Sequence, residues 1–110
     1  MAEPLDWVAL RAQCASDEQL VAELLALFRG EVDGQLHDVE QAVAARDPEA
    51  LVYAAHRLKG ALVALAAGPA TEAAIALEHV GAQRDLQAAP PLLAQLQQEI
   101  SRLISAISAQ

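Results

Sequence analysis

The chain has 110 residues, of which 55% are hydrophobic and only 3% aromatic, and its formal net charge is −8. This length predicts a single domain over residues 1–110 with enough apolar surface to form a core. The negative net charge argues against a nucleic-acid ligand, because phosphate backbones are bound by clusters of Lys and Arg. The single cysteine, Cys14, excludes an internal disulfide, and no cluster of Cys and His indicates a zinc site.

The sequence contains no segment that predicts secretion or a membrane span. No apolar run approaches the roughly 20 residues that cross a bilayer. The first residues also lack the basic start and apolar stretch of a signal peptide. We therefore expect a cytoplasmic protein that makes no contact with a membrane.

The first two predicted elements are a short helix and a long one. Apolar side chains within residues 5–14 predict a short amphipathic helix. Ser16 and Gln19 have the spacing of a capping box, so we expect a second helix to begin behind Ser16 and to run from about 17 to 45. Its apolar residues recur in steps of three and four and form one stripe, which consists of Leu20, Leu24, Phe28, Val32, Leu36, Val39 and Val43.

A third helix is predicted to begin at Asp47 and Pro48. An aspartate can cap a helix, and proline suits the first helical position because its missing N–H has no partner there. The core stripe of this helix recurs in steps of four and three and consists of Leu51, Ala55, Leu58, Leu62 and Leu65. We expect Gly68 to provide a left-handed exit from this helix and Pro69 to start the next one.

Two more helices complete the chain. The inner face of the fourth helix carries small residues, so we expect this helix to pack closely on its neighbours. The residues of this face are Ala70, Ala73, Leu77, and Val80 or Gly81. The connection 85–91 contains Pro90 and Pro91, which we expect to stop one helix before the last begins at about 91. The last stripe consists of Leu93, Leu96, Ile100, Leu103 and Ile107.

The predicted fold is all-α. Four amphipathic helices joined by short loops favour an antiparallel up-and-down four-helix bundle. The segment 5–14 adds a short additional helix at the N-terminus. No strand pattern and no internal repeat compete with this interpretation.

The candidate functional residues lie on the third predicted helix. Lys59, the only lysine in the chain, follows His56 by three residues, so the two side chains share a helix face. Gly60 follows His56 by four residues on the same face. A side chain at position 60 would lean back over position 56, so we interpret Gly60 as a clearance that leaves the imidazole open to an arriving anion.

Counting residues outward from the turn near Gly68 places Glu78 at about the level of His56. Three roles for Glu78 remain open. Its carboxylate could accept a hydrogen bond from the imidazole, it could repel a phosphate by its charge, or it could be a solvated surface group. The sequence slightly favours repulsion, because an acid is an unfavourable neighbour for a phosphoryl group.

The segment around His56 resembles the H-x-L-K-G-[SA] signature of histidine phosphotransfer (HPt) domains of two-component phosphorelays. The matching residues are His56, Arg57, Leu58, Lys59, Gly60 and Ala61. Further similarities are a Leu-Asp start, an aspartate before the histidine helix, and Leu77 with Glu78 behind it. One difference is that the family commonly has Leu-Gly-Ala after the histidine helix, whereas this chain has Leu65-Ala66-Ala67, so we expect the turn to be displaced toward Gly68.

The resemblance implies a role for each residue of the site. His56 would be the phosphoacceptor, Lys59 would stabilise the charge of the phosphoryl group, and Gly60 would provide clearance. Glu78 would stand close behind the histidine as a supporting residue. The receiver-docking flank would comprise Val52, Arg57 and Val63.

The resemblance also implies the partners of the protein. Response-regulator receiver domains, and a hybrid sensor histidine kinase, would donate and accept the phosphoryl group through their aspartates. The domain itself would be a monomeric phosphocarrier without kinase or phosphatase activity and without an intrinsic cofactor. The receiver domain would supply Mg²⁺.

Three other interpretations of the sequence compete with this one. A helical adaptor could bind a receiver domain without phosphotransfer, and binding that does not depend on His56 would favour it. A histidine-kinase dimerisation domain would have an acidic residue after the histidine and a proline one turn on, which the sequence lacks. A metal site formed by His37, His56 and His79 has little support, because their spacing provides no local pair of ligands.

Overall fold

The structure of the protein is a computed structural model that describes residues 2–109. Within this range the chain is helical and contains no strand, which confirms the all-α prediction. The elements are α1 (Trp7–Gln13), α2 (Glu18–Ala45), α3 (Pro48–Ala64), α4 (Gly68–Ala82), the short 3₁₀ helix η1 (Leu86–Ala88) and α5 (Ala89–Ser108).

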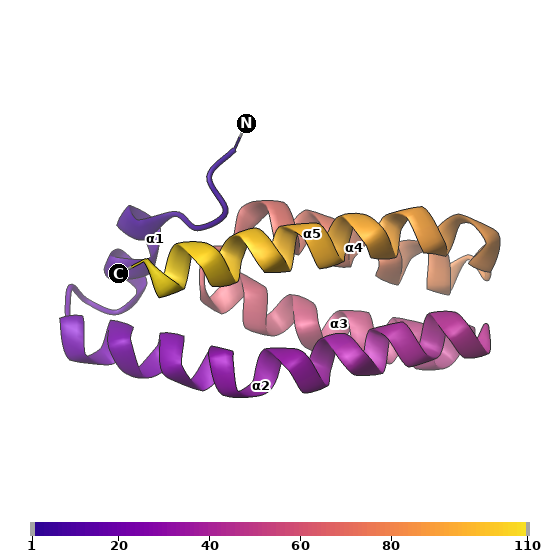
Figure 1. The fold of residues 1–110 in the computed structure, drawn as a ribbon, viewed down its shortest axis with the longest axis horizontal. Helices are drawn as coiled ribbons and strands as arrows, with labels where there is room; N and C mark the ends of the chain where they lie inside the picture. Colours follow the sequence, from indigo (N-terminus) through magenta and orange to yellow (C-terminus); the bar gives the residue numbers. More distant parts are fainter. Residues whose placement is uncertain (1, 110) are drawn as a thin grey trace.

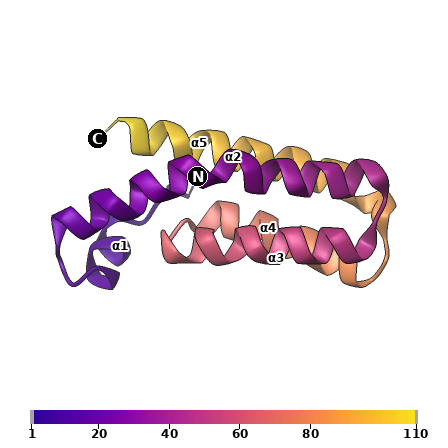
Figure 2. The same cartoon turned by 90° about the horizontal axis from the view of Figure 1, so that it is seen from below.

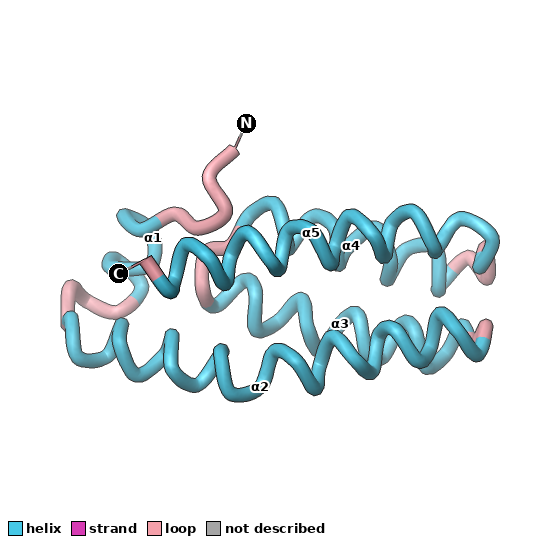
Figure 3. The backbone as a smooth tube through the Cα atoms, in the orientation of Figure 1, coloured by secondary structure: helices cyan, strands magenta, loops and turns pink. Residues whose placement is uncertain are grey.

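Helices α2 to α5 run alternately up and down along the long axis of the molecule, as the bundle prediction requires (Figure 1). The molecule measures 42 × 26 × 20 Å. The short helix α1 lies at one end of the bundle, near the start of α2 and the end of α5. The connections between the long helices are brief, so consecutive helices are antiparallel neighbours (Figure 3).

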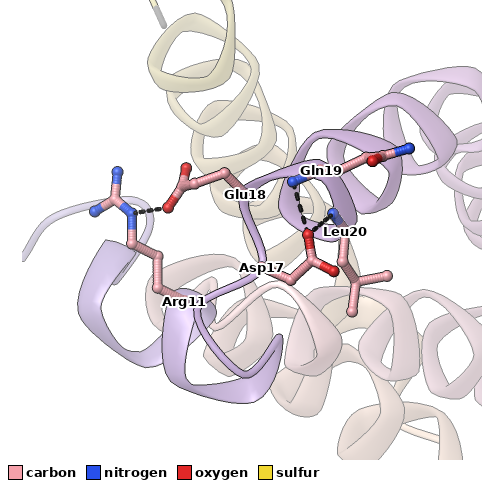
Figure 4. A network of polar contacts seen from close by, with 5 residues as sticks. All are labelled: Arg11, Asp17, Glu18, Gln19 and Leu20. Carbon is pink, nitrogen blue, oxygen red and sulfur yellow. Dashed lines mark hydrogen bonds and ion pairs between the residues drawn. The ribbon is translucent and has the colours of Figure 1, made fainter.

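The predicted capping box at Ser16 is wrong, because Asp17 caps α2. The Asp17 side chain accepts hydrogen bonds from the backbone N–H groups of Gln19 and Leu20, at 3.0 and 3.2 Å (Figure 4). Ser16 has a left-handed backbone with φ of 60° and belongs to the preceding turn. Asp47, in contrast, caps α3 as predicted, through a bond from the N–H of Ala50.

The turn between α3 and α4 also differs from the prediction. Ala66 adopts the left-handed conformation, with φ of 57°, and Gly68 does not. The N–H of Ala66 bonds to the carbonyl of Val63, and the N–H of Ala67 to that of Leu62, which is the pattern of a Schellman cap. Because these two bonds close the helix, the turn stays at Ala66 and is not displaced.

The start of the last helix is a third correction. Helix α5 begins at Ala89, and Pro90 and Pro91 lie in its first turn. The first N–H groups of a helix have no partner inside it, so prolines there break no hydrogen bond. The pair therefore belongs to the helix start and does not stop the preceding element.

The core agrees with the predicted stripes in α3 but only partly in α2. All five stripe residues of α3 are fully buried. In α2, Phe28, Val32 and Val39 are buried, whereas Leu20 is 44% exposed and Val21 takes its place in the core. The reason is that α2 begins beyond the end of α3 (Figure 2), so its first turns do not face that helix.

Helix α4 packs closely on α3, as its small residues predicted. A Cβ atom added to Gly81 would lie 3.0 Å from Cγ2 of Val52 and 3.3 Å from the carbonyl oxygen of Pro48. Glycine at this position therefore permits the close contact between the helices. Glu78 lies three residues before Gly81 and so shares its face of α4.

Candidate functional site

His56 lies on the exposed edge of α3, next to the core. Its neighbours Ala55 and Leu58 are fully buried, while 66% of the His56 side chain is exposed. The buried residues fix the helix in the bundle, and the imidazole projects from this fixed support. The ring is therefore held in position and is accessible from outside.

Glu78 of α4 joins His56 and Lys59 into one cluster. Its Oε2 lies 3.2 Å from Nδ1 of His56, and its Oε1 lies 2.8 Å from Nζ of Lys59. Only 25% of the Glu78 side chain is exposed, so it is not the solvated surface group that remained open from the sequence. The two contacts place it directly behind the imidazole.

The contact with Glu78 determines which ring nitrogen of His56 can react. A carboxylate only accepts hydrogen bonds, so Nδ1 carries the proton that points to Oε2. In a neutral ring the other nitrogen, Nε2, then carries the lone pair. The arrangement presents a nucleophilic Nε2 on an exposed side chain.

The charge of Glu78 is maintained by its neighbours. The Lys59 ammonium is the main cause that lowers the pKa of Glu78 below its ordinary value of 4.5, and His56 adds to this, while partial burial opposes it. A lowered pKa means that the stabilising effect of this carboxylate is present above its ordinary pKa and is lost as the pH falls through the lowered value. Glu78 is thus ionised at neutral pH.

Gly60 borders open space on the surface of α3. It is exposed, and a Cβ atom at this position would have no atom within 4 Å. The packing of the bundle therefore does not require glycine here. The role of Gly60 as a clearance for the imidazole stays a prediction.

A groove next to His56 contains a residue that the sequence analysis missed. Its volume is about 520 Å³, and its lining includes Val52, Tyr53, His56 and Gly81. Tyr53 is 71% exposed. The available signal was its position three residues before His56, which puts both on one helix face.

The three residues of the predicted docking flank differ in their exposure. Val52 is half-buried against Gly81, whereas Arg57 and Val63 are exposed. Arg57 lines a hollow toward α2, and Val63 lines one toward α1. Their role in docking stays a prediction.

Metal and membrane sites have no support in the part of the chain that the structure describes. Across residues 2–109, no three His, Cys, Asp or Glu side chains are grouped to hold a metal ion. His37 and His79 are exposed and belong to no such group. No helix in this range is both long and apolar enough to span a membrane.

Comparison with known proteins agrees with this geometry. The Hpt domain family matches residues 23–106. Histidine-containing phosphotransfer protein B (HptB) from Pseudomonas aeruginosa PAO1 is similar in structure, with a TM-score of 0.90 and 26% identity over 99% of this chain and 95% of that one. The HPT domain of a sensor hybrid histidine kinase from Shewanella has a TM-score of 0.85 and 17% identity over 97% of this chain and 92% of that one. No match was found among curated protein sequences.

A four-helix bundle that presents an exposed histidine beside a lysine is the arrangement of a phosphocarrier module. The match over residues 23–106 shows that the chain belongs to the Hpt domain family. Its function is histidine phosphotransfer in a phosphorelay. Domains of this family interact with receiver domains and hybrid kinases of two-component systems.

Proposed function

We propose that Nε2 of His56 accepts a phosphoryl group from an aspartyl phosphate of a receiver domain and passes it to another. The observation that carries this proposal is the bond between Nδ1 and Glu78, at 3.2 Å, because it leaves the lone pair on Nε2 of an exposed ring. In the transfer, the bond from phosphorus to the aspartyl oxygen breaks and the bond from phosphorus to Nε2 forms. The aspartate leaves as a carboxylate.

The residues around His56 would share the work of this step. Attack by Nε2 makes the ring cationic while Nδ1 keeps its proton, and the Glu78 carboxylate would stabilise this charge. Lys59 would turn from Glu78 toward the phosphoryl oxygens. Mg²⁺ and the in-line geometry would come from the receiver domain, and we infer no kinase or phosphatase activity of the domain itself.

The proposal is tested by incubating the protein with a phosphorylated receiver domain. Transfer should produce a label that is labile in acid and stable in alkali, as a phosphohistidine is. A receiver domain that binds tightly but never transfers a label would instead support the adaptor hypothesis. We expect the protein to act in this assay as a monomer.

Replacing Lys59 is expected to slow transfer with little effect on folding. Lys59→Ala removes a charge that would face the phosphoryl group and also leaves the Glu78 carboxylate without its ion pair. We expect transfer to slow by roughly tenfold or more. The melting temperature should fall only slightly, because about a quarter of each side chain of this ion pair is exposed and water weakens the attraction. Single-turnover kinetics and thermal melting measure the two effects.

The control for Lys59 is Arg29→Ala, which removes an exposed cation of α2 and should leave the rate unchanged. Equal loss of rate in Lys59→Ala and Arg29→Ala would show that only net charge matters and would contradict a specific role of Lys59.

Variants of Glu78 distinguish the positioning role from repulsion. A hydrogen bond to a charged group contributes roughly 1.5–3 kcal/mol, so Glu78→Ala should slow phosphorylation of His56 by roughly 10- to 100-fold. Glu78→Gln should lose less, because its amide oxygen can still accept from Nδ1. Because Glu78 contacts the ring, we expect it to position the imidazole. The sequence alone slightly favoured the other role, in which Glu78 repels the phosphate.

These rates should be measured at low and high salt, together with the ¹⁵N chemical shifts of the His56 ring. In the wild type we expect the proton on Nδ1, and in Glu78→Ala a shift toward the other tautomer. Faster phosphorylation of Glu78→Ala, with the ring tautomer unchanged, would contradict positioning and restore repulsion.

A further inference from the structure

Glu78 contacts the ring nitrogen of His56 that phosphorylation would leave free. Its Oε2 lies 3.2 Å from Nδ1, whereas the phosphoryl group would be attached to Nε2. Once Nε2 is bonded to phosphorus, it no longer binds a proton, so the proton on Nδ1 is the one that the phosphorylated ring holds or loses. Glu78 therefore faces the single titrating position of the phosphorylated ring.

The proton on Nδ1 decides how readily the phosphoryl group leaves. When the bond from phosphorus to Nε2 breaks, its electron pair returns to the ring. A ring that holds the Nδ1 proton leaves as neutral imidazole. A ring without this proton would have to leave as an imidazolate anion, which is a far poorer leaving group. Discharge therefore takes place from the protonated, cationic ring.

Water can reach the phosphorylated ring, because 66% of the His56 side chain is exposed. In the absence of a receiver domain, the lifetime of the phosphorylated state is then set by hydrolysis. Water attacks phosphorus, the bond from phosphorus to Nε2 breaks, and inorganic phosphate and the neutral ring are the products. The rate of this reaction reports how much of the ring holds the Nδ1 proton.

The charges on the α4 side of the ring are dominated by Glu78. Among the residues that the structure describes, it is the only charged one that hydrogen-bonds to the ring. Lys59 bonds to the other carboxylate oxygen, Oε1, at 2.8 Å. The groove beside the ring is also lined by Tyr53 and by Glu49 and Arg84, which pair with each other. The carboxylate of Glu78 thus acts on the ring most directly.

The charges on the α2 side act on the ring only from a distance. Glu31, His37 and Asp38 of α2 line a separate hollow together with Arg57 of α3. None of these four residues lines the groove beside the imidazole. Exposed charges that do not touch a group are screened by water and salt. Their effect on the ring is therefore small beside that of Glu78.

We infer that Glu78 keeps the Nδ1 proton on the phosphorylated His56 ring at pH values at which a free phosphohistidine has lost it. The phosphorylated protein then discharges through the neutral and alkaline range and does not store the phosphoryl group. Glu78 is a positioning residue in this role, because it acts on phosphorus through the ring. The inference rests on the proposed phosphorylation of Nε2 and adds to it how the lifetime of the phosphorylated state is regulated.

Phosphorylation would strengthen the effect of Glu78 on the ring. A phosphoryl group is negatively charged and competes with Glu78 for the Lys59 ammonium. The carboxylate stays ionised without Lys59, because neutral pH lies well above its ordinary pKa of 4.5. Freed from Lys59, it faces the cationic ring alone, and a negative charge so close favours the cationic form by about tenfold or more.

The test loads the protein with phosphoramidate, a small donor that phosphorylates histidine without a receiver domain. The bond from phosphorus to the donor nitrogen breaks, ammonia leaves, and the bond from phosphorus to Nε2 forms. The variant is Glu78→Gln, whose amide oxygen still accepts from Nδ1 although the charge is lost. The control is Glu72→Gln, the same change at an exposed acid of α4. Glu78→Asp keeps the charge and should restore the wild-type behaviour at least in part.

Hydrolysis is followed by ³¹P NMR from about pH 6 to about pH 9, a range that includes the ordinary pKa of histidine. At the alkaline end, the wild type and Glu72→Gln should discharge at least about tenfold faster than Glu78→Gln, because their rings stay protonated. At the acid end all rings are protonated. The wild type should then discharge no faster than Glu78→Gln, because the carboxylate stabilises the cationic ring that discharge removes. The ¹⁵N shifts of the ring report the Nδ1 proton in the same samples.

The outcomes separate this inference from the proposed function. Superimposed pH profiles of the wild type and Glu78→Gln, with receiver domains still labelling the wild type, would overturn the inference and leave phosphotransfer intact. Faster discharge of the wild type by the same factor at every pH would also overturn it, because repulsion by Glu78 does not depend on the ring proton. If the profiles differ as expected but no receiver domain exchanges a phosphoryl group with the protein, the proposed function fails and the role of Glu78 stands. Absence of a phosphoryl group on Nε2 after either donor would overturn both.

Discussion

Replacing His56 by glutamine is expected to abolish phosphorylation of the protein. The amide nitrogen of glutamine has no lone pair available for attack on phosphorus, whereas its N–H groups can still bond to Glu78. The His56 side chain is 66% exposed, so the bundle should remain folded with almost unchanged stability. The measurement is the acid-labile label after incubation with a phosphorylated receiver domain.

The matched control for this loss is His79→Gln, which changes an exposed histidine one residue beyond Glu78. It should be labelled like the wild type. His56→Gln should also still bind the receiver domain, because it changes one exposed side chain and leaves the rest of the surface intact. Label that survives in His56→Gln would place the phosphoacceptor elsewhere and contradict the assignment.

Replacing Gly60 by leucine is the second change for which we expect a large effect, and its two consequences have opposite signs. The new side chain would lean back over His56 and cover Nε2, so transfer should fall by about as much as in His56→Gln. The fold should be as stable or slightly more stable, because the variant removes a helix glycine that costs roughly 1 kcal/mol and fills open space. Transfer kinetics and thermal melting give the two results.

Gly60→Ala provides the comparison. Its methyl group should gain similar helix stability but cover little of the ring, so its transfer rate should stay close to that of the wild type. Wild-type rates in a folded Gly60→Leu protein would refute the clearance argument. Unfolding of Gly60→Leu would mean that Gly60 is needed for packing, contrary to the open space around it.

Much of the fold was predictable because local patterns and packing agree. The stripe of α3 is completely buried, as its spacing predicted, because α3 faces the other helices along its whole length. Pro48 and Asp47 mark its start for reasons that involve only neighbouring backbone groups. The shared face of His56, Lys59 and Gly60 was also predictable, because residues three and four positions apart lie on one face of any α-helix.

Local ambiguity explains the errors at the helix ends. Ser16 and Asp17 are both good capping residues, and sequence spacing favoured the first. The structure uses Asp17, because Ser16 is needed in left-handed conformation to close the turn after α1. Similarly, glycine is the usual residue in left-handed conformation at the end of a helix. Here Ala66 has this conformation, because backbone hydrogen bonds to the carbonyls of Leu62 and Val63 end α3 there.

By itself, the sequence determined the helices, the order in which they pack, and the face that carries His56, because these follow from hydrophobic periodicity and short loops. Only the tertiary structure decided how the helices are rotated and offset against one another. The packing of α4 on α3, which is close at Gly81, brings Glu78 into contact with both His56 and Lys59, and the offset of α2 exposes Leu20. Gln35 is likewise buried, and its Oε1 has no hydrogen-bond partner among the described residues. This burial depends on how the helices pack, which sequence spacing does not contain.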